Sequence, residues 1–230
     1  MDKLTPVRRR NPGGSCLFAI FFAALLVLGQ FSSAQAQSAG IFLDGLFEDW
    51  FSQPNVPDPQ GDAWTLHTDI SAFYFTNNPD QDYLFFMAER WNAGSEGLDL
   101  RLFIDTNNNG DMTETVDRMI EVRYHPNQGG RTYVDLYDGA GGFLRQVAYQ
   151  MDWGAPGKGN KVEWGVTFAD LGITPNQTIR MQLVSFSGNK VSDSVAEVQW
   201  SPANALGWYL LVFLGTIGLG WLYHRRRSLA

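Results

Sequence analysis

The chain has one cysteine, Cys16, among its 230 residues. A disulfide framework is therefore excluded, and so are a cysteine-based metal site and a cysteine nucleophile in the domain that follows. Basic residues are also scarce between positions 38 and 203, where 23 Asp and Glu stand against 10 Lys and Arg. A formal charge near −13 in this span is a poor surface for the phosphates of nucleic acid. No nucleic-acid partner is expected, and the span suits a domain that binds cations or works outside the cell.

Motifs of common catalytic sites are missing as well. There is no Ser-His-Asp order and no phosphate-binding loop, and among so many acids no pair of carboxylates stands out as a glycosidase pair. The span has no internal repeat, no low-complexity stretch and no sustained helical periodicity. The sequence therefore favours a protein that is not an enzyme and whose main domain is not built of helices.

The first hydrophobic run lies close to the N-terminus. Four of residues 1–14 are basic, an uncharged apolar run of 14 residues follows at 16–29, and small residues lead to Ala34-Gln35-Ala36. This order is typical of a secretory signal peptide, and the run is shorter than the roughly 20 residues of a membrane span. We expect residues 1–36 to be a signal peptide cleaved after Ala36. Cleavage after Ala34 and an uncleaved signal anchor remain open.

The second hydrophobic run, residues 205–223, has 19 residues without a charge. As a helix it would extend roughly 28 Å, close to the thickness of the hydrocarbon core. Trp and Tyr stand at both of its ends, and Arg225, Arg226 and Arg227 follow, which marks that side as cytoplasmic. We expect a single-pass transmembrane helix at 205–223, a cytoplasmic tail at 224–230, and an exported domain held outside the cell membrane.

An apolar helix closed by an arginine cluster also resembles the C-terminal sorting signals of bacteria and archaea. In those systems a sorting transpeptidase removes the helix and transfers the protein to the cell surface. The tripeptide that usually precedes such a helix is absent, and Ser-Pro-Ala-Asn stands at 201–204 instead. A permanent membrane anchor and a removable sorting helix both remain open.

Between the two runs, residues 38–203 have the length of one domain. Short β-rich runs recur there, separated by clusters of Gly, Asn, Asp and Pro. We expect an all-β fold, an antiparallel, jelly-roll-like β-sandwich of about ten strands, with one C-terminal transmembrane helix in addition. A single helical turn is expected at 168–172. The expected strands are Ile41–Leu43, Ile70–Thr76, Tyr83–Arg90, Leu98–Asp105, Arg118–Tyr124, Thr132–Tyr137, Phe143–Tyr149, Lys161–Phe168, Thr178–Ser187 and Ala196–Trp200.

Several local motifs together resemble one family. They follow one another as Ile41–Trp50, residues 58–70, Asp82–Glu89, Leu102–Asp105 and Val162–Ile173. In order and spacing they are similar to family-nine carbohydrate-binding modules and their DOMON-like relatives. The resemblance implies a sandwich of about ten strands, often with bound calcium, that acts as a binding module rather than a catalyst.

The loop that begins at Asp105 is the strongest candidate for a metal site. Oxygen-bearing side chains at alternate positions, with Gly110 at the sixth, allow a loop to curl around calcium. The twelfth position of an EF-hand is Val116 here instead of Glu, and Glu114 and Asp117 could supply the missing carboxylate. An Asn-rich turn without metal is the alternative. The expected calcium ligands are Asp105, Asn107, Asn109, Asp111 and Asp117.

A second acidic group lies nearer the N-terminus. In the family that the chain resembles, the positions of Asp44 and Asp49 mostly organise the first turn, and the position of Trp50 packs into the core. We expect structural roles here, and calcium at Asp58, Asp62 or Asp69 remains an alternative. The whole group is Asp44, Glu48, Asp49, Asp58, Asp62 and Asp69.

Exposed aromatic rings would support glycan binding, because flat apolar faces stack on sugars while a few polar groups fix the hydroxyls. The candidates are Trp64, Trp91, Trp153 and Trp164. Trp164 alternates with Val162 and Val166, which favours a place in the core. Trp91 and Trp153 lie beside turns, and we expect these two to bind the ligand.

Three hypotheses follow for the function. The first is a surface-displayed, membrane-anchored and non-enzymatic module that binds glycan or other cell-envelope material and is stabilised by calcium. The second is a structural envelope protein without a small ligand. The third is a haem-binding electron-transfer module, because some DOMON-like domains hold haem with Met and His ligands. Its candidate ligands are His67, His125 and Met87, although core packing explains Met87 more simply.

Overall fold

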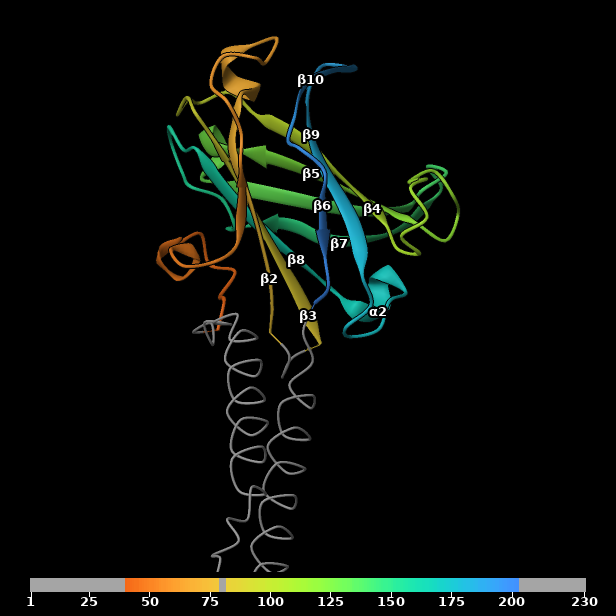
Figure 1. The fold of residues 1–230 in the computed structure, drawn as a ribbon. Coiled ribbons are helices and arrows are strands. Elements are labelled where there is room, and N and C mark those ends of the chain that lie inside the picture. Colours follow the sequence, from red (N-terminus) through yellow and green to blue (C-terminus); the bar gives the residue numbers. More distant parts are fainter. Residues whose placement is uncertain (1–39, 79–81, 203–230) are drawn as a thin grey trace, which may run out of the picture. The chain divides into compact units, whose positions relative to one another are not determined.

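A computed structural model describes residues 40–78 and 82–202 of the chain. They form two antiparallel β-sheets with a main core between them (Figure 1), which confirms the expected all-β sandwich. Within these ranges, no helix has the length and apolarity that a membrane crossing requires. The expected signal peptide 1–36, the expected helix 205–223 and the tail 224–230 lie outside the described residues.

The smaller sheet has four strands in the order β1-β2-β3-β8. They are β1 (Asn55–Pro57), β2 (Ile70–Asn78), β3 (Tyr83–Arg90) and β8 (Lys161–Thr167). The register sets Phe86 of β3 between Phe75 and Trp164 on the neighbouring strands. Aromatic side chains in such cross-strand positions stabilise a sheet and fix its register.

The larger sheet has the order β10-β9-β4-β5-β6-β7, and β11 also pairs with β9. Consecutive strands β4 to β7 are neighbours: short connections join β5 to β6 and β6 to β7, and the longer loop 106–117 joins β4 to β5. The strands are β4 (Leu98–Asp105), β5 (Arg118–His125), β6 (Arg131–Asp138), β7 (Phe143–Met151), β9 (Ile179–Ser187), β10 (Lys190–Ser194) and β11 (Val198–Trp200).

The described helices are all short. Three are single 3₁₀ turns: η1 (Glu48–Trp50), η2 (Leu66–Thr68) and η3 (Pro126–Gln128). The expected turn at 168–172 is confirmed as α2 (Phe168–Leu171), which begins at a capping box of Thr167 and Asp170. It ends at Gly172, whose φ of 69° is a left-handed conformation that glycine adopts without strain.

One expected strand is wrong and two strands were missed. Residues 41–43 are not a strand, because Ile41 packs on the outer face of the smaller sheet without pairing along it. Strand β1 was missed because it has three residues and ends in Pro57. Strand β10 was missed because it carries Lys, Ser and Asp, which are poor strand formers.

Strand β3 is buried on both faces. Leu84, Phe86 and Ala88 point into the main core, because alternate residues of a strand face the same side. Phe85 and Met87 point outward and are also buried, against Ile41 and Trp50 among others. The segment 41–50 therefore covers the outer face of the smaller sheet. Trp164 is fully buried in the main core, as expected.

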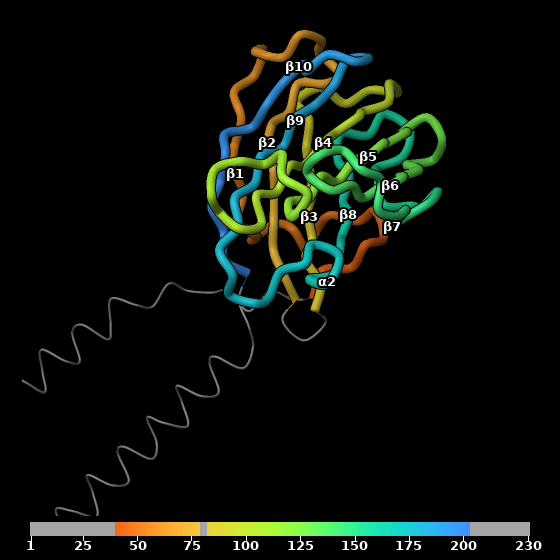
Figure 2. Tube along the Cα trace, turned by 90° about the vertical axis from the view of Figure 1, so that its right-hand side faces the viewer, coloured from red at the N-terminus to blue at the C-terminus, as the bar shows by residue number. Residues whose placement is uncertain are grey.

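Strand β9 connects two opposite ends of the domain. At its first residue, Ile179 pairs with Trp200, and at its last, Ser187 pairs with Lys190 of β10. Nine extended residues span about 27 Å. Residues 58–69 and the β9–β10 turn lie together at one end, while both ends of the described chain lie at the other (Figures 1 and 2). We call residues 58–69, 91–97 and 188–193 the distal end.

Candidate functional site

The predicted calcium loop follows β4, and its two buried carboxylates bind the loop's own backbone. Asp105 accepts hydrogen bonds from the N–H groups of Asn109 (3.1 Å) and Gly110 (2.7 Å). Asp117 accepts from the N–H of Thr106 (2.9 Å). These carboxylates hold the two ends of the loop together.

The other predicted ligands in this loop are engaged in the same way. Asn107 accepts from the backbone of Asn109 (3.0 Å), Asn109 accepts from that of Asp111 (2.8 Å), and Asp111 accepts from that of Thr113 (2.8 Å). The side-chain amides of Asn107 and Asn109 both donate to Glu114. This pattern is that of a hydrogen-bonded Asn-rich turn, and calcium in the loop stays a prediction.

The two predicted ligand-binding tryptophans lie on separate loops. Trp91 directly follows β3 and is 44% exposed. Trp153 follows β7, is half-buried, and packs against the main core. No ring contact among the described residues includes either side chain. The structure therefore leaves Trp91 as the better-exposed surface ring and does not join the two in one site.

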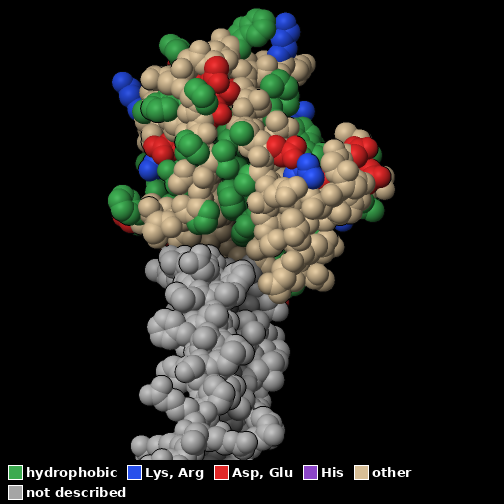
Figure 3. All heavy atoms as spheres, in the orientation of Figure 1, with side chains coloured by type: hydrophobic (Ala, Val, Ile, Leu, Met, Phe, Trp, Pro, Cys, Tyr) green, Lys and Arg blue, Asp and Glu red, His purple; other side chains and the backbone are tan. Residues whose placement is uncertain are grey.

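Trp91 belongs to an apolar surface at the distal end. Trp64 and Leu66, on the neighbouring loop, are 73% and 72% exposed. The loops adjoin, since the side-chain amide of Asn92 donates to the carbonyl of Leu66 (3.2 Å). Figure 3 shows hydrophobic side chains with a basic side chain beside them at this end. We call Trp64, Leu66 and Trp91 the distal apolar surface, because large apolar residues gathered in this way mark interaction sites.

Hydrogen bonds hold the ring of Trp91 and the backbone of Trp64. The indole N–H of Trp91 donates to the carbonyl of Asp58 (3.2 Å). The backbone N–H of Trp64 donates to the carbonyl of Ser192 (3.0 Å). The ammonium group of Lys190 lies 5.3 Å from the centre of the Trp64 ring, within the range of a cation–π contact. Both rings are therefore presented on an ordered backbone.

A hollow of about 170 Å³ lies beside the distal apolar surface. It is smaller than the pockets of about 300–1,000 Å³ that enclose drug-sized ligands, so a ligand would lie on it rather than inside it. Its imidazole, amide and carboxylate groups are the kinds that bind hydroxyl groups. The lining residues are Leu66, His67, Asn92, Ala93, Gly94 and Glu96.

Buried Arg90 holds the backbone beneath this hollow. Its side chain is fully buried, and its five N–H groups all donate to carbonyl oxygens. Nη1 reaches the carbonyls of His67 (3.0 Å) and Glu96 (3.1 Å), and Nη2 reaches those of Gly94 (2.6 Å) and Gly159 (2.7 Å). Burial lowers the pKa of Arg90 from its usual value. Sequence reasoning missed this residue, because its partners are backbone atoms that no motif reveals.

Three carboxylates lie close together at the distal end. Asp58, Asp62 and Asp193 each have an oxygen within 4.8 Å of the others, and no second group of three or more potential ligands was found among the described residues. Burial, followed by the charges of neighbouring carboxylates, raises the pKa of Asp58 to about 7. The sequence indicated Asp58 and Asp62 but not Asp193, which strand pairing brings to them from far along the chain.

The first turn has the structural role that was expected. Asp44 accepts a hydrogen bond from the N–H of Leu46 (2.9 Å), and Asp49 accepts one from the N–H of Phe42 (2.9 Å). Trp50 is 1% exposed. These residues shape and bury the segment that covers the smaller sheet.

Glu163 of β8 fixes this segment to the sheet, and sequence reasoning missed it. One of its oxygens accepts from the N–H groups of Asp44 and Gly45 (both 2.8 Å), and the other accepts from the indole of Trp50 (2.8 Å). Gly45 is required there, since its φ is 76° and a Cβ would lie 2.8 Å from the carbonyl oxygen of Asp152. Burial raises the pKa of Glu163 to about 7, although the three N–H donors oppose that shift.

The candidate haem ligands lie on different elements. Met87 packs in the outer cluster with Trp50, as core packing predicts. His67 lines the distal hollow, and the ring of His125 lies 5.6 Å from that of Tyr133 on the larger sheet. Packing therefore explains Met87 without a cofactor.

Comparison with known proteins finds no relative: no family model, no curated protein and no solved structure matches the chain.

Proposed function

We propose that the protein is a non-catalytic binding module whose distal end binds glycan or similar hydroxyl-rich material of the cell envelope. One observation supports this most strongly, namely the distal apolar surface beside a polar hollow. Exposed Trp64 and Trp91 offer faces for stacking on sugar rings, and His67, Asn92 and Glu96 offer groups for hydroxyls.

The position of the distal end supports display at a surface. It lies opposite the two ends of the described chain (Figure 1). We propose that residues 1–36 direct export and that residues 205–223 anchor the protein in the membrane or serve as a sorting signal. The distal end would then face away from the membrane, toward envelope material.

We also propose that the sandwich is of the DOMON-like, family-nine carbohydrate-binding-module type. The order of the motifs between Ile41 and Ile173 supports this, together with two antiparallel sheets and a buried Trp50. Calcium binding would be consistent with that type, and with the surplus of carboxylates over basic groups in the domain.

A sedimentation assay with insoluble polysaccharides tests the proposed function. The full chain, kept soluble in mild detergent, is expected to sediment with at least one polysaccharide of a broad panel that includes cell-wall preparations. The same chain unfolded in denaturant and a detergent-only sample serve as controls. Failure of the folded chain to bind any member of the panel would contradict glycan binding and favour a structural envelope protein.

A further inference from the structure

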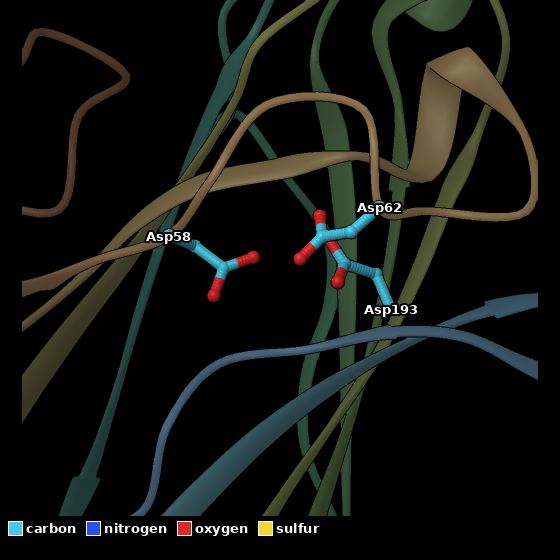
Figure 4. A group of neighbouring side chains, drawn as sticks. All are labelled: Asp58, Asp62 and Asp193. Carbon is cyan, nitrogen blue, oxygen red and sulfur yellow. The ribbon is translucent and has the colours of Figure 1, made fainter.

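Three carboxylates from distant parts of the chain converge below the distal apolar surface. Asp58 and Asp62 belong to the 58–69 loop and Asp193 to β10, and their side chains point toward one another (Figure 4). One oxygen of each lies within 4.8 Å of the others. Calcium holds its oxygen ligands at about 2.3–2.6 Å, so two ligands of one ion are at most about 5 Å apart. The three oxygens are therefore close enough to share one ion.

Two buried oxygens in this region have no hydrogen-bond partner. Asp58 is 7% exposed, and its Oδ2 has none. Asp69, whose charge acts on both Asp58 and Asp193, is 1% exposed, and its Oδ1 has none. Burying a carboxylate oxygen without a donor is costly, and such groups are normally paired with a cation or bound to a metal.

Among the described residues, no basic side chain forms an ion pair with this group. None of the ion pairs in the described part of the chain includes Asp58, Asp62, Asp69 or Asp193. A proton shared between Asp58 and Asp193 would leave the other two carboxylates uncompensated. A divalent cation compensates more of the negative charge than one shared proton does. It would also coordinate the oxygen of Asp58 that has no hydrogen-bond partner.

We propose that Asp58, Asp62 and Asp193 bind one hard divalent cation of the calcium class, with Asp69 beside them, and that the cation fastens the 58–69 loop to β10. An all-oxygen set disfavours soft ions, which prefer thiolate or imidazole. Three carboxylates from two separate segments favour calcium over magnesium, which usually takes one or two carboxylates and keeps several waters. This proposal does not depend on glycan binding, because the experiments below add only the cation and no glycan.

The backbone around the site is ordered independently of the ion. Asp193 accepts hydrogen bonds from the N–H groups of Ile70 (2.7 Å) and Ser194 (2.7 Å), which aim its carboxylate at the loop. The carbonyl of Asp58 accepts the indole N–H of Trp91, and Asp62 lies two residues before Trp64. A bound cation would therefore add one more connection to the loop that carries Trp64 and contacts Trp91.

Thermal unfolding of the full chain in mild detergent tests the site. After removal of metal with a chelator, calcium at a hundredfold excess over its Kd is expected to raise Tm by about 5 °C or more, and magnesium by less. Asp58→Asn and Asp62→Asn should each remove this rise. In chelator, Asp58→Asn should be at least as stable as the wild type, because it removes a carboxylate from a repulsive group.

Asp99→Asn is the matched control, since Asp99 is an exposed acid on β4 and belongs to neither predicted group of calcium ligands. It should keep the calcium-induced rise in Tm. No rise in the wild type would mean that a proton alone occupies the group, and would overturn the proposal. A rise lost in Asp111→Asn, in the other predicted calcium loop, but kept in Asp62→Asn would overturn it as well.

Terbium luminescence gives a second readout that does not depend on stability. Terbium replaces calcium in oxygen sites and is excited by nearby tryptophan, and Trp64 and Trp91 adjoin the proposed ligands. Emission should be lost in Asp62→Asn, whose exposed position makes the variant safe for folding, and kept in Asp99→Asn. Equal emission from both variants would contradict the site.

Discussion

Replacing Arg90 with methionine is expected to destabilise the domain by about 3 kcal/mol or more. Methionine fills much of the same volume but donates no hydrogen bond. The carbonyls of His67, Gly94, Glu96 and Gly159 would lose their donors in a buried or partly buried region, and each buried acceptor left without a partner costs about 1–3 kcal/mol. The hollow of the distal end should lose its shape together with stability.

Denaturant unfolding of the full chain measures this effect. Arg101→Met is the matched control, since the Arg101 side chain is 39% exposed and pairs with Glu121 at 3.1 Å. Its loss is expected to cost about 1 kcal/mol or less. Arg90→Lys tests whether charge alone suffices, and it should recover little, because an ammonium group cannot donate to all four carbonyls as the planar guanidinium does. Equal costs for Arg90→Met and Arg101→Met would contradict the role of Arg90.

Protonation of Glu163 is expected to make stability depend on pH in an unusual direction. Its pKa is about 7 in the folded protein against a usual value of 4.5. The folded state therefore binds the proton more tightly than the unfolded state. The resulting stability is fully present below pH 4.5 and is lost as pH rises through about 7. The difference amounts to at most about 3 kcal/mol, from about 1.4 kcal/mol for each pH unit.

The contribution of Glu163 is isolated by comparison with Glu163→Gln. Unfolding midpoints of both proteins are measured from pH 4.5 to pH 8 in chelator. Asp58 then titrates in the same way in both proteins, so its contribution cancels in the difference between them. The wild type should lose stability relative to the variant as pH rises. At pH 8 the variant should be less stable by about 1–3 kcal/mol, because the amide N–H₂ of glutamine cannot accept from the indole of Trp50, and this difference should grow as pH falls. Parallel pH profiles would contradict the role of Glu163.

The strands with clear alternation were predictable from the sequence. Strand β4, Leu98–Asp105, has the expected bounds, since its apolar residues alternate with polar ones and a turn-forming run follows it. Strand β3 has the expected bounds too, although it is buried on both faces. Its continuous apolar run and the turn before it were sufficient.

Contacts between distant segments were not predictable. The spacing of residues in the sequence cannot place Asp193 beside Asp58, because Asp193 comes close to Asp58 only when β10 pairs with β9. Glu163 lies between Val162 and Trp164, which face the main core, and its partners lie more than a hundred positions earlier. The alternate spacing of its oxygen-bearing residues identified the Asp105 loop. The sequence could not show that backbone N–H groups of the folded turn donate to these oxygens.

The most direct test of the distal end as the binding surface is a comparison of binding isotherms. The full chain, the double variant Trp64→Ala/Trp91→Ala, and Phe51→Ala are titrated onto the polysaccharide that the folded chain binds. Phe51 is 95% exposed, directly after the segment that covers the smaller sheet, so Phe51→Ala removes an exposed ring away from the distal end. The double variant should bind at least about tenfold more weakly, while Phe51→Ala should bind like the wild type. Unchanged binding by the double variant would contradict a binding surface at the distal end.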